Sequence, residues 1–189
     1  MDIEVIAPVD VRIMQNWNPV IDQALYLIKK AKSTHSEKID YGNSTLYHIG
    51  LLGCVSQHKI SNNWHVLVGP WTKKHLPWLD KMMLDMTDLE PIYGISILDG
   101  DAAEHIDFPN MPTAFNYPVF TTASETYVKH NNTEYCYPGI ADQPWILNTQ
   151  CLHGVRNNEF RVVFNLHFGK TFKEVKQWFT DHPNLVYSG

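Results

Sequence analysis

Residues 91–121 read PIYGISILDGDAAEHIDFPNMPTAFNYPVFT, and this stretch decides the fold class. Two short runs rich in aromatic and β-branched residues, Ile92 to Leu98 and Ala114 to Thr121, are separated by Gly, Asp, Pro and Asn residues. Such spacing is typical of strands joined by turns. The same pattern of short β-forming runs separated by turn residues continues through Glu125 to Lys129, Glu134 to Tyr137, Trp145 to Leu147 and Phe160 to Phe168. This half of the chain therefore predicts an antiparallel sandwich or barrel.

Three segments outside the β-rich stretch have apolar residues at helical spacing, namely Pro19 to Lys32, about Lys74 to Leu89, and Thr171 to Thr180. Each predicts an amphipathic helix. In the last of them Thr171 is followed three residues later by Glu174, which is the spacing of a capping box. We expect the helices to cover the outside of the β-core.

The segments Thr45 to Val55 and Trp64 to Val68 have short apolar or alternating runs, which predict strands or irregular segments. The chain has 189 residues, a length that fits one domain with a substantial core. We predict a single domain with a helical and β support region (residues 1–90), a metal-binding β-core (residues 91–169) and a C-terminal helix (residues 170–189).

Composition excludes several classes of partner. The net charge is −5 and the basic residues are scattered, so a nucleic-acid partner is not expected. The three cysteines, Cys54, Cys136 and Cys151, are too few and too irregularly spaced for a disulfide framework or a cysteine-rich zinc site. No stretch resembles a signal peptide or a membrane span. We therefore expect a cytoplasmic protein with reduced thiols and no membrane partner, and the sequence leaves the oligomeric state unknown.

The segment Glu104-His105-Ile106-Asp107 contains a potential metal site. His105 and Asp107 are two residues apart, so on an extended strand their side chains leave from the same face. An imidazole and a carboxylate suit iron(II), and a second histidine would complete the two-histidine, one-carboxylate facial triad. His153 is the candidate, because it comes shortly before the β-forming run that begins at Phe160.

Arg161 opens that run. A hairpin centred on Asn157-Asn158 would bring its strand alongside the strand that carries His153. A buried arginine beside a metal needs an anion, and its planar fork can pair bidentately with a carboxylate. His167 is an even number of residues further on, so it is expected on the same face of the strand as Arg161.

These residues resemble a known family. The phrases His105-Ile106-Asp107-Phe108-Pro109-Asn110, His153-Gly154-Val155 and Arg161-Val162-Val163-Phe164 look most like the aspartyl/asparaginyl β-hydroxylase and prolyl-hydroxylase-like branches of the iron(II)/2-oxoglutarate-dependent dioxygenases. The resemblance covers about Pro91 to Gly169. The interval from the second histidine to the arginine is slightly shorter than in many relatives, so Arg156 is a rival for the role of Arg161.

The resemblance implies an α+β, mainly β, double-stranded β-helix (jelly-roll, cupin-like) with supporting helices. It implies that His105, Asp107 and His153 bind Fe(2+) and that Arg161 binds the distal carboxylate of 2-oxoglutarate. The reaction would convert 2-oxoglutarate and O2 to succinate and CO2 while hydroxylating an amino-acid side chain, in a protein, peptide or free amino acid. Further polar candidates for holding the cosubstrate are Asn116, Thr121, Tyr127 and Thr149.

Two other classes of function remain open at the level of sequence. The first is a non-catalytic cupin-like module that binds a metal or a small molecule. The second is a structural β-sandwich in which the three ligands are a coincidence. Arg161 discriminates between the enzyme and the module, because only oxoacid chemistry requires an arginine on the strand after the second histidine.

Overall fold

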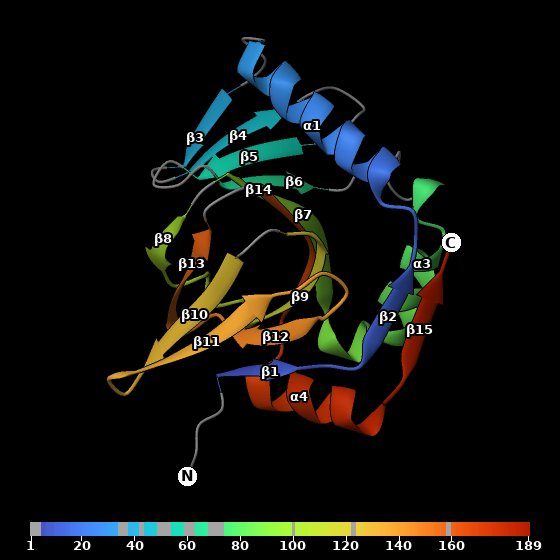
Figure 1. The fold of residues 1–189 in the computed structure, drawn as a ribbon, viewed down its shortest axis with the longest axis vertical. Coiled ribbons are helices and arrows are strands. Elements are labelled where there is room, and N and C mark those ends of the chain that lie inside the picture. The colour runs from blue at the N-terminus through green and yellow to red at the C-terminus, as the bar shows by residue number, and fades with distance from the viewer. Residues whose placement is uncertain are drawn as a thin grey trace.

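The computed structural model describes residues 5–33, 38–41, 44–48, 54–58, 63–67, 74–99, 101–121, 124–157 and 160–189. Most of these residues lie in strands (Figure 1). Within this part of the chain, none of the helices combines the length and the apolar character that crossing a membrane requires.

The larger sheet contains β1 (Ile6–Pro8), β3 (Lys38–Tyr41), β4 (Ser44–His48), β5 (Cys54–His58), β6 (Asn63–Leu67), β7 (Pro91–Asp99), β9 (Thr113–Phe120), β12 (Trp145–Asn148) and β14 (Phe160–Phe168). Its strand order is β1-β12-β9-β14-β7-β6-β5-β4-β3. The neighbouring strands pair antiparallel. The sheet thus joins strands from both sides of residue 90, and the proposed division of the domain at residues 90 and 169 stays a prediction.

The smaller sheet contains β8 (Ala102–His105), β10 (Ser124–His130), β11 (Thr133–Gly139) and β13 (Leu152–Asn157). Its order is β11-β10-β13-β8, again antiparallel. A separate parallel pair joins β2 (Val11–Met14) to β15 (Leu185–Ser188), near the two ends of the chain.

The two sheets face each other (Figure 1). Val128 of β10 packs in one buried cluster with Trp145 and Leu147 of β12, and the Arg161 guanidinium of β14 donates a hydrogen bond to Thr126 Oγ1 of β10. These contacts close a space between the sheets. The predicted double-stranded β-helix is therefore confirmed, and it is mainly β as expected.

Helices cover the outer face of the larger sheet, as predicted. They are α1 (Asn18–Ser33), α3 (Trp78–Asp85) and α4 (Phe172–Asp181), with a 3-10 helix η2 (Thr87–Leu89) after α3. The residues of β14 alternate between two environments because successive side chains in a strand point to opposite faces. Val162, Phe164, Leu166 and Phe168 belong to the core that includes helix residues. Arg161 and His167 therefore face the other way, toward the smaller sheet.

The three predicted helices are found, two of them within one residue of the predicted bounds. Helix α4 begins after Thr171, and the capping box is present: the Glu174 N–H donates to Thr171 Oγ1, and the Thr171 N–H donates to the Glu174 carboxylate. The helix predicted from about Lys74 to Leu89 is interrupted: Lys74 and His75 are helical, α3 runs from Trp78 to Asp85 with Pro77 at its N-cap, and η2 follows it. A proline disfavours helical conformation in the residue before it, which explains the break at Leu76.

The run Thr45 to Val55, predicted as one extended or irregular segment, corresponds to two paired strands, β4 and β5. Residues 49–53, which fall within that prediction, lie outside the described residues. The run Trp64 to Val68 corresponds to β6, and Val68 also lies outside the described residues.

The predicted hairpin between the His153 strand and the Arg161 strand is wrong. β13 pairs with β10 and β8, whereas β14 pairs with β9 and β7. Both edges of each strand are thus already hydrogen-bonded, and the chain passes from one sheet to the other between Asn157 and Phe160. Asn158 of the predicted turn lies outside the described residues. His153 and Arg161 nevertheless share the space between the sheets, because the sheets face each other.

Candidate metal centre

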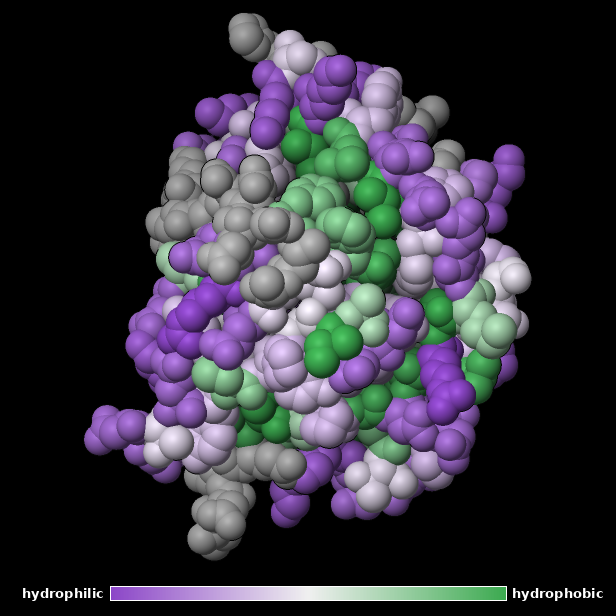
Figure 2. Space-filling model, viewed as in Figure 1, coloured by the Kyte–Doolittle hydropathy of each residue, from purple (hydrophilic) through white to green (hydrophobic). Residues whose placement is uncertain are grey.

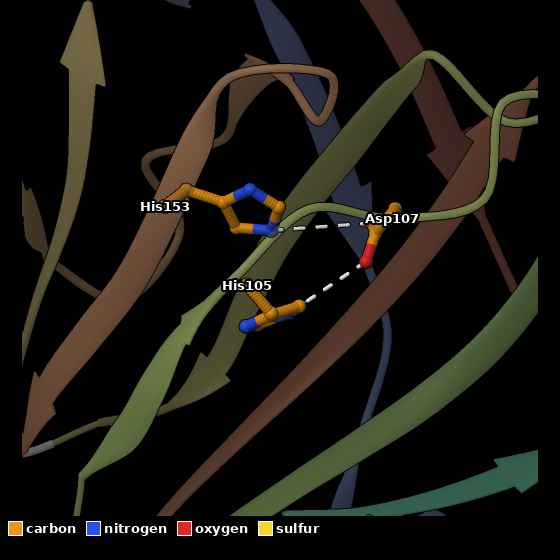
Figure 3. A group of neighbouring side chains, drawn as sticks. All are labelled: His105, Asp107 and His153. Carbon is orange, nitrogen blue, oxygen red and sulfur yellow. Dashed lines mark ion pairs between the residues drawn. The ribbon is translucent and has the colours of Figure 1, made fainter. Parts of the chain in front are cut away.

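Two neighbouring strands of the smaller sheet bring the three predicted metal ligands together (Figure 3). His105 ends β8 and is the cross-strand partner of His153 on β13, with ring centroids 4.4 Å apart. Asp107 lies just beyond the end of β8. Its Oδ1 is 3.6 Å from His105 Nε2 and its Oδ2 is 4.0 Å from His153 Nε2. One ligand atom from each residue lies within 4.8 Å of the other two, so small side-chain rotations can bring all three onto one ion.

Backbone carbonyls orient both histidines. His105 Nδ1 is 2.8 Å from the Ala103 carbonyl oxygen, and His153 Nδ1 is 2.9 Å from the Cys151 carbonyl oxygen. An Nδ1 proton donated to a carbonyl leaves the lone pair on Nε2, the atom that faces Asp107. Burial lowers the pKa of His153, only partly offset by the Asp107 charge. The donor set is therefore two imidazoles and a carboxylate, which fits iron(II).

The loop that carries Asp107 is held by the turn after β12. The Asp107 N–H donates to the Thr149 carbonyl at 3.0 Å. Thr149 Oγ1 donates to the Met111 carbonyl at 2.6 Å, and the Thr149 N–H donates to the Pro112 carbonyl at 3.1 Å. Thr149 was predicted from the sequence as a cosubstrate contact. In the structure the Thr149 hydroxyl is hydrogen-bonded to the loop that carries Asp107, so Thr149 is placed to position a metal ligand.

Replacing Thr149 with valine is expected to lower iron affinity several-fold and to destabilise the fold by about 1–3 kcal/mol, because the Met111 carbonyl loses its buried donor. Iron titration and denaturant unfolding measure the two effects. Thr113→Val is the matched control, since Thr113 is equally buried and donates to the Lys170 carbonyl. The control should lose stability and keep its iron affinity; an equal loss of affinity in both variants would argue against a positioning role.

Arg161 is buried between the sheets, and no acidic side chain among the described residues pairs with it. It is 7% exposed, and one of its terminal nitrogens donates to Thr126 Oγ1 at 3.3 Å. Its Nε has no hydrogen-bond partner among the described residues. Burial lowers the pKa of the guanidinium to about 10, so it keeps its charge at neutral pH. A buried charge of this kind is costly unless an anion joins it.

Two further buried donors face the same space. Asn116 Nδ2 and Trp145 Nε1 have no hydrogen-bond partner among the described residues. The two residues are cross-strand partners on β9 and β12, and Trp145 contacts the smaller sheet through Val128. Together with Arg161 they offer hydrogen atoms to an acceptor-rich ligand. The sequence predicts Asn116 as a cosubstrate contact but does not single out Trp145, because nothing in the sequence distinguishes an indole that only packs in the core from one whose N–H can donate to a ligand.

The structure does not bring Tyr127 and Arg156 to this space. Both lie on the outer face of the smaller sheet, with the Arg156 guanidinium 4.0 Å from the centroid of the Tyr127 ring. Arg156 pairs with both oxygens of Glu134 and with Glu125, each at 2.8 Å. Figure 2 shows hydrophilic residues along the left edge of the molecule, where β8 and β13 lie in Figure 1. Arg156 is thus already neutralised, which leaves Arg161 as the arginine that faces the metal ligands.

Thr121 lies at the end of β9, and its Oγ1 is 2.7 Å from Ser124 Oγ. Its role as a cosubstrate contact, like those of Asn116 and Tyr127, stays a prediction. His167, noted from the sequence for its spacing from Arg161, is within reach of the metal ligands: its Nδ1 is 3.9 Å from Asp107 Oδ2. Burial lowers the pKa of His167.

Gly154, the neighbour of His153, makes room for Tyr127. A Cβ at Gly154 would lie 2.6 Å from Tyr127 Oη and 2.9 Å from the Ala102 carbonyl oxygen. Gly154→Ala is therefore expected to destabilise the protein by about 1–3 kcal/mol through overpacking, measured by denaturant unfolding. Combining it with Tyr127→Ala should remove much of that penalty, which a double-mutant cycle detects. Simple additivity of the two penalties would contradict this explanation.

Comparison with known proteins agrees with the fold. No protein-family model and no curated protein matches the sequence. A prolyl hydroxylase from Trichoplax adhaerens, solved in complex with a hypoxia inducible factor oxygen degradation domain peptide fragment, has a TM-score of 0.54 at 12% identity, over 86% of this chain and 82% of that one. EvdMO1 has a TM-score of 0.52 at 8% identity, over 88% of this chain and 47% of that one.

A Pseudomonas putida prolyl-4-hydroxylase gives a TM-score of 0.46 at 9% identity, over 87% of this chain and 91% of that one. At these identities the likeness concerns the fold. The chain thus shares the double-stranded β-helix fold of the Trichoplax adhaerens prolyl hydroxylase.

Proposed function

We propose that this protein is an iron(II)- and 2-oxoglutarate-dependent dioxygenase that hydroxylates an amino-acid side chain in a protein or peptide. The main support for this proposal is the burial of the Arg161 side chain. Its charged guanidinium is buried, has no carboxylate partner among the residues that the structure describes, and faces the same space between the sheets as the His105, Asp107 and His153 group. A dicarboxylate that chelates the metal at one end would supply the missing anion at the other.

Each residue has a distinct part in this scheme. His105, Asp107 and His153 would hold the iron through three positions and leave the others for the oxoacid and dioxygen. When bound, the iron supplies the oxidising chemistry. Arg161 would orient the distal carboxylate through its planar fork, while Thr126 fixes the guanidinium. The Asn116 and Trp145 donors would satisfy further oxygen atoms.

The reaction is balanced by the two oxygen atoms of dioxygen. One enters succinate as 2-oxoglutarate loses CO2, and the other enters the substrate, whose C–H bond becomes C–OH. The proposed class of substrate is supported by the surface beside the metal ligands. Ile106 and Phe108 flank Asp107 and are 56% and 70% exposed. Exposed apolar residues next to a reactive centre suit contact with a peptide.

The Trichoplax adhaerens prolyl hydroxylase was solved with a bound peptide, which also supports a protein or peptide substrate. A protein or peptide is therefore the favoured substrate over a free amino acid. The predicted cytoplasmic location fits such a substrate and stays a prediction.

The test is turnover under labelled dioxygen. Iron-loaded protein, 2-oxoglutarate and a panel of peptides are incubated under 18-oxygen gas, and succinate and peptides are measured by mass spectrometry. We expect labelled succinate, and one added labelled oxygen in the peptide that is the substrate. The Asp107→Ala variant is the control for iron chemistry in solution. Equal amounts of labelled succinate from the wild type and this variant would reject the proposed activity.

A further inference from the structure

His167 lies beside the metal ligands without an assigned role. It is on the inner face of β14, like Arg161 six residues earlier. Its Nδ1 is buried and has no hydrogen-bond partner among the described residues. Its cross-strand neighbours, Ala114 on β9 and Ile92 on β7, have no polar side-chain atoms. The polar group that faces Nδ1 is Asp107 Oδ2, at 3.9 Å, which is too long for a hydrogen bond.

His167 is close to the three metal ligands but is not one of them. The compact group of ligand atoms, found among the described residues, consists of His105, Asp107 and His153 and does not include His167. Asp107 presents Oδ1 toward His105 and Oδ2 toward His167 and His153. His167 thus lies on the Oδ2 side of the carboxylate, which His153 also faces, whereas Oδ1 faces His105.

We propose that His167 is a positioning residue, which donates its Nδ1 hydrogen to Asp107 Oδ2 and thereby holds this carboxylate in one-oxygen coordination. The inference rests on the proposed iron site. A carboxylate bound through both oxygens would occupy one more position on the metal, and the oxoacid and dioxygen need the open positions. Hydrogen bonds to a ligating carboxylate also fix its orientation before the metal arrives.

The contact requires a small movement. A hydrogen bond to oxygen needs a nitrogen to oxygen distance near 3 Å, so the side chains must approach by roughly 1 Å. Asp107 is the residue expected to move, because gathering the three ligand atoms onto one ion already requires its carboxylate to rotate. The backbone of Asp107 stays fixed by its hydrogen bond to Thr149.

The experiment is an anaerobic titration of the metal-free protein with cobalt(II), whose visible absorption reports both affinity and coordination. His167→Leu removes the donor, and His167→Asn keeps an amide N–H at nearly the position of Nδ1. We expect cobalt(II) affinity to fall about 10- to 100-fold in the leucine variant and to recover to within a few-fold of wild type in the asparagine variant. His182→Leu removes an imidazole from the end of α4 and should have no effect.

Thermal unfolding of each metal-free variant shows that the protein is folded before titration. Unchanged affinity in His167→Leu would overturn the inference and leave the metal site intact. A weak asparagine variant whose spectrum shows the loss of one imidazole ligand would overturn it too, because His167 would then bind the metal. Failure of the folded wild type to bind cobalt(II) or iron(II) would instead reject the proposed function, and His167 would have no metal ligand to position.

Discussion

Replacing Arg161 with leucine is expected to weaken the binding of 2-oxoglutarate strongly and to spare the binding of iron. Arg161 is a buried cation in the space between the sheets, and its Nε has no hydrogen-bond partner among the described residues. Loss of one member of a buried charge pair costs about 2–5 kcal/mol, so the Kd for the cosubstrate should rise roughly 30- to 4,000-fold. Calorimetry of the iron-loaded or manganese-loaded protein with 2-oxoglutarate measures this change.

Arg161→Leu is expected to weaken cosubstrate binding but to raise the stability of the protein without cosubstrate. In the protein without cosubstrate the Arg161 charge is buried and has no acidic partner in the described part of the chain, so leucine should raise the Tm of that form. Arg156→Leu is the matched control: Arg156 lies on the outer face, paired with Glu125 and Glu134, and its loss should leave cosubstrate affinity unchanged. Retention of 2-oxoglutarate binding by Arg161→Leu would favour a cupin-like metal module instead.

Replacing Asp107 with alanine is expected to cause the largest loss of metal affinity, more than the roughly 100-fold that an outer partner contributes. Asp107 is the carboxylate within reach of both His105 and His153, and its charge offsets that of the cation. Without it, two imidazoles remain. Anaerobic iron(II) titration measures the affinity.

Glu104→Gln is the control for this variant. Glu104 is a carboxylate only three residues from Asp107, but its side chain pairs with Lys129 on the outer face of the smaller sheet. Its replacement should leave iron binding unchanged. A comparable loss in both variants would indicate a general effect of negative charge rather than coordination.

The sequence predicted those parts of the fold whose signal is local. The run from Phe160 to Phe168 alternates aromatic and aliphatic residues with Arg161 and His167, and β14 follows the same bounds. The pairing of Thr171 with Glu174 predicted the start of α4. The two-residue spacing of His105 and Asp107 predicted a shared face, although β8 ends at His105 and Asp107 lies in the loop beyond it.

Other features depend on contacts between distant residues and have no local signal. β2 and β15 pair although they lie near opposite ends of the chain, and each has only four residues. β8 and β13 are also short strands that the sequence did not delimit. The sequence does not show whether the chain after β13 forms a hairpin or crosses to the other sheet, because turn-forming residues such as Asn157 are expected in both cases. The role of Thr149 depends on the Met111 loop, 38 residues earlier.

We expect His105, Asp107, His153 and Arg161 to form one site for iron and an oxoacid. Anaerobic titration of metal-free protein with iron(II) and then 2-oxoglutarate detects such a site by the visible charge-transfer band of an oxoacid chelated to iron(II). We predict a band that saturates with one iron per chain and is absent in His105→Ala. A folded, iron-loaded wild type that develops no band on adding 2-oxoglutarate would contradict the account.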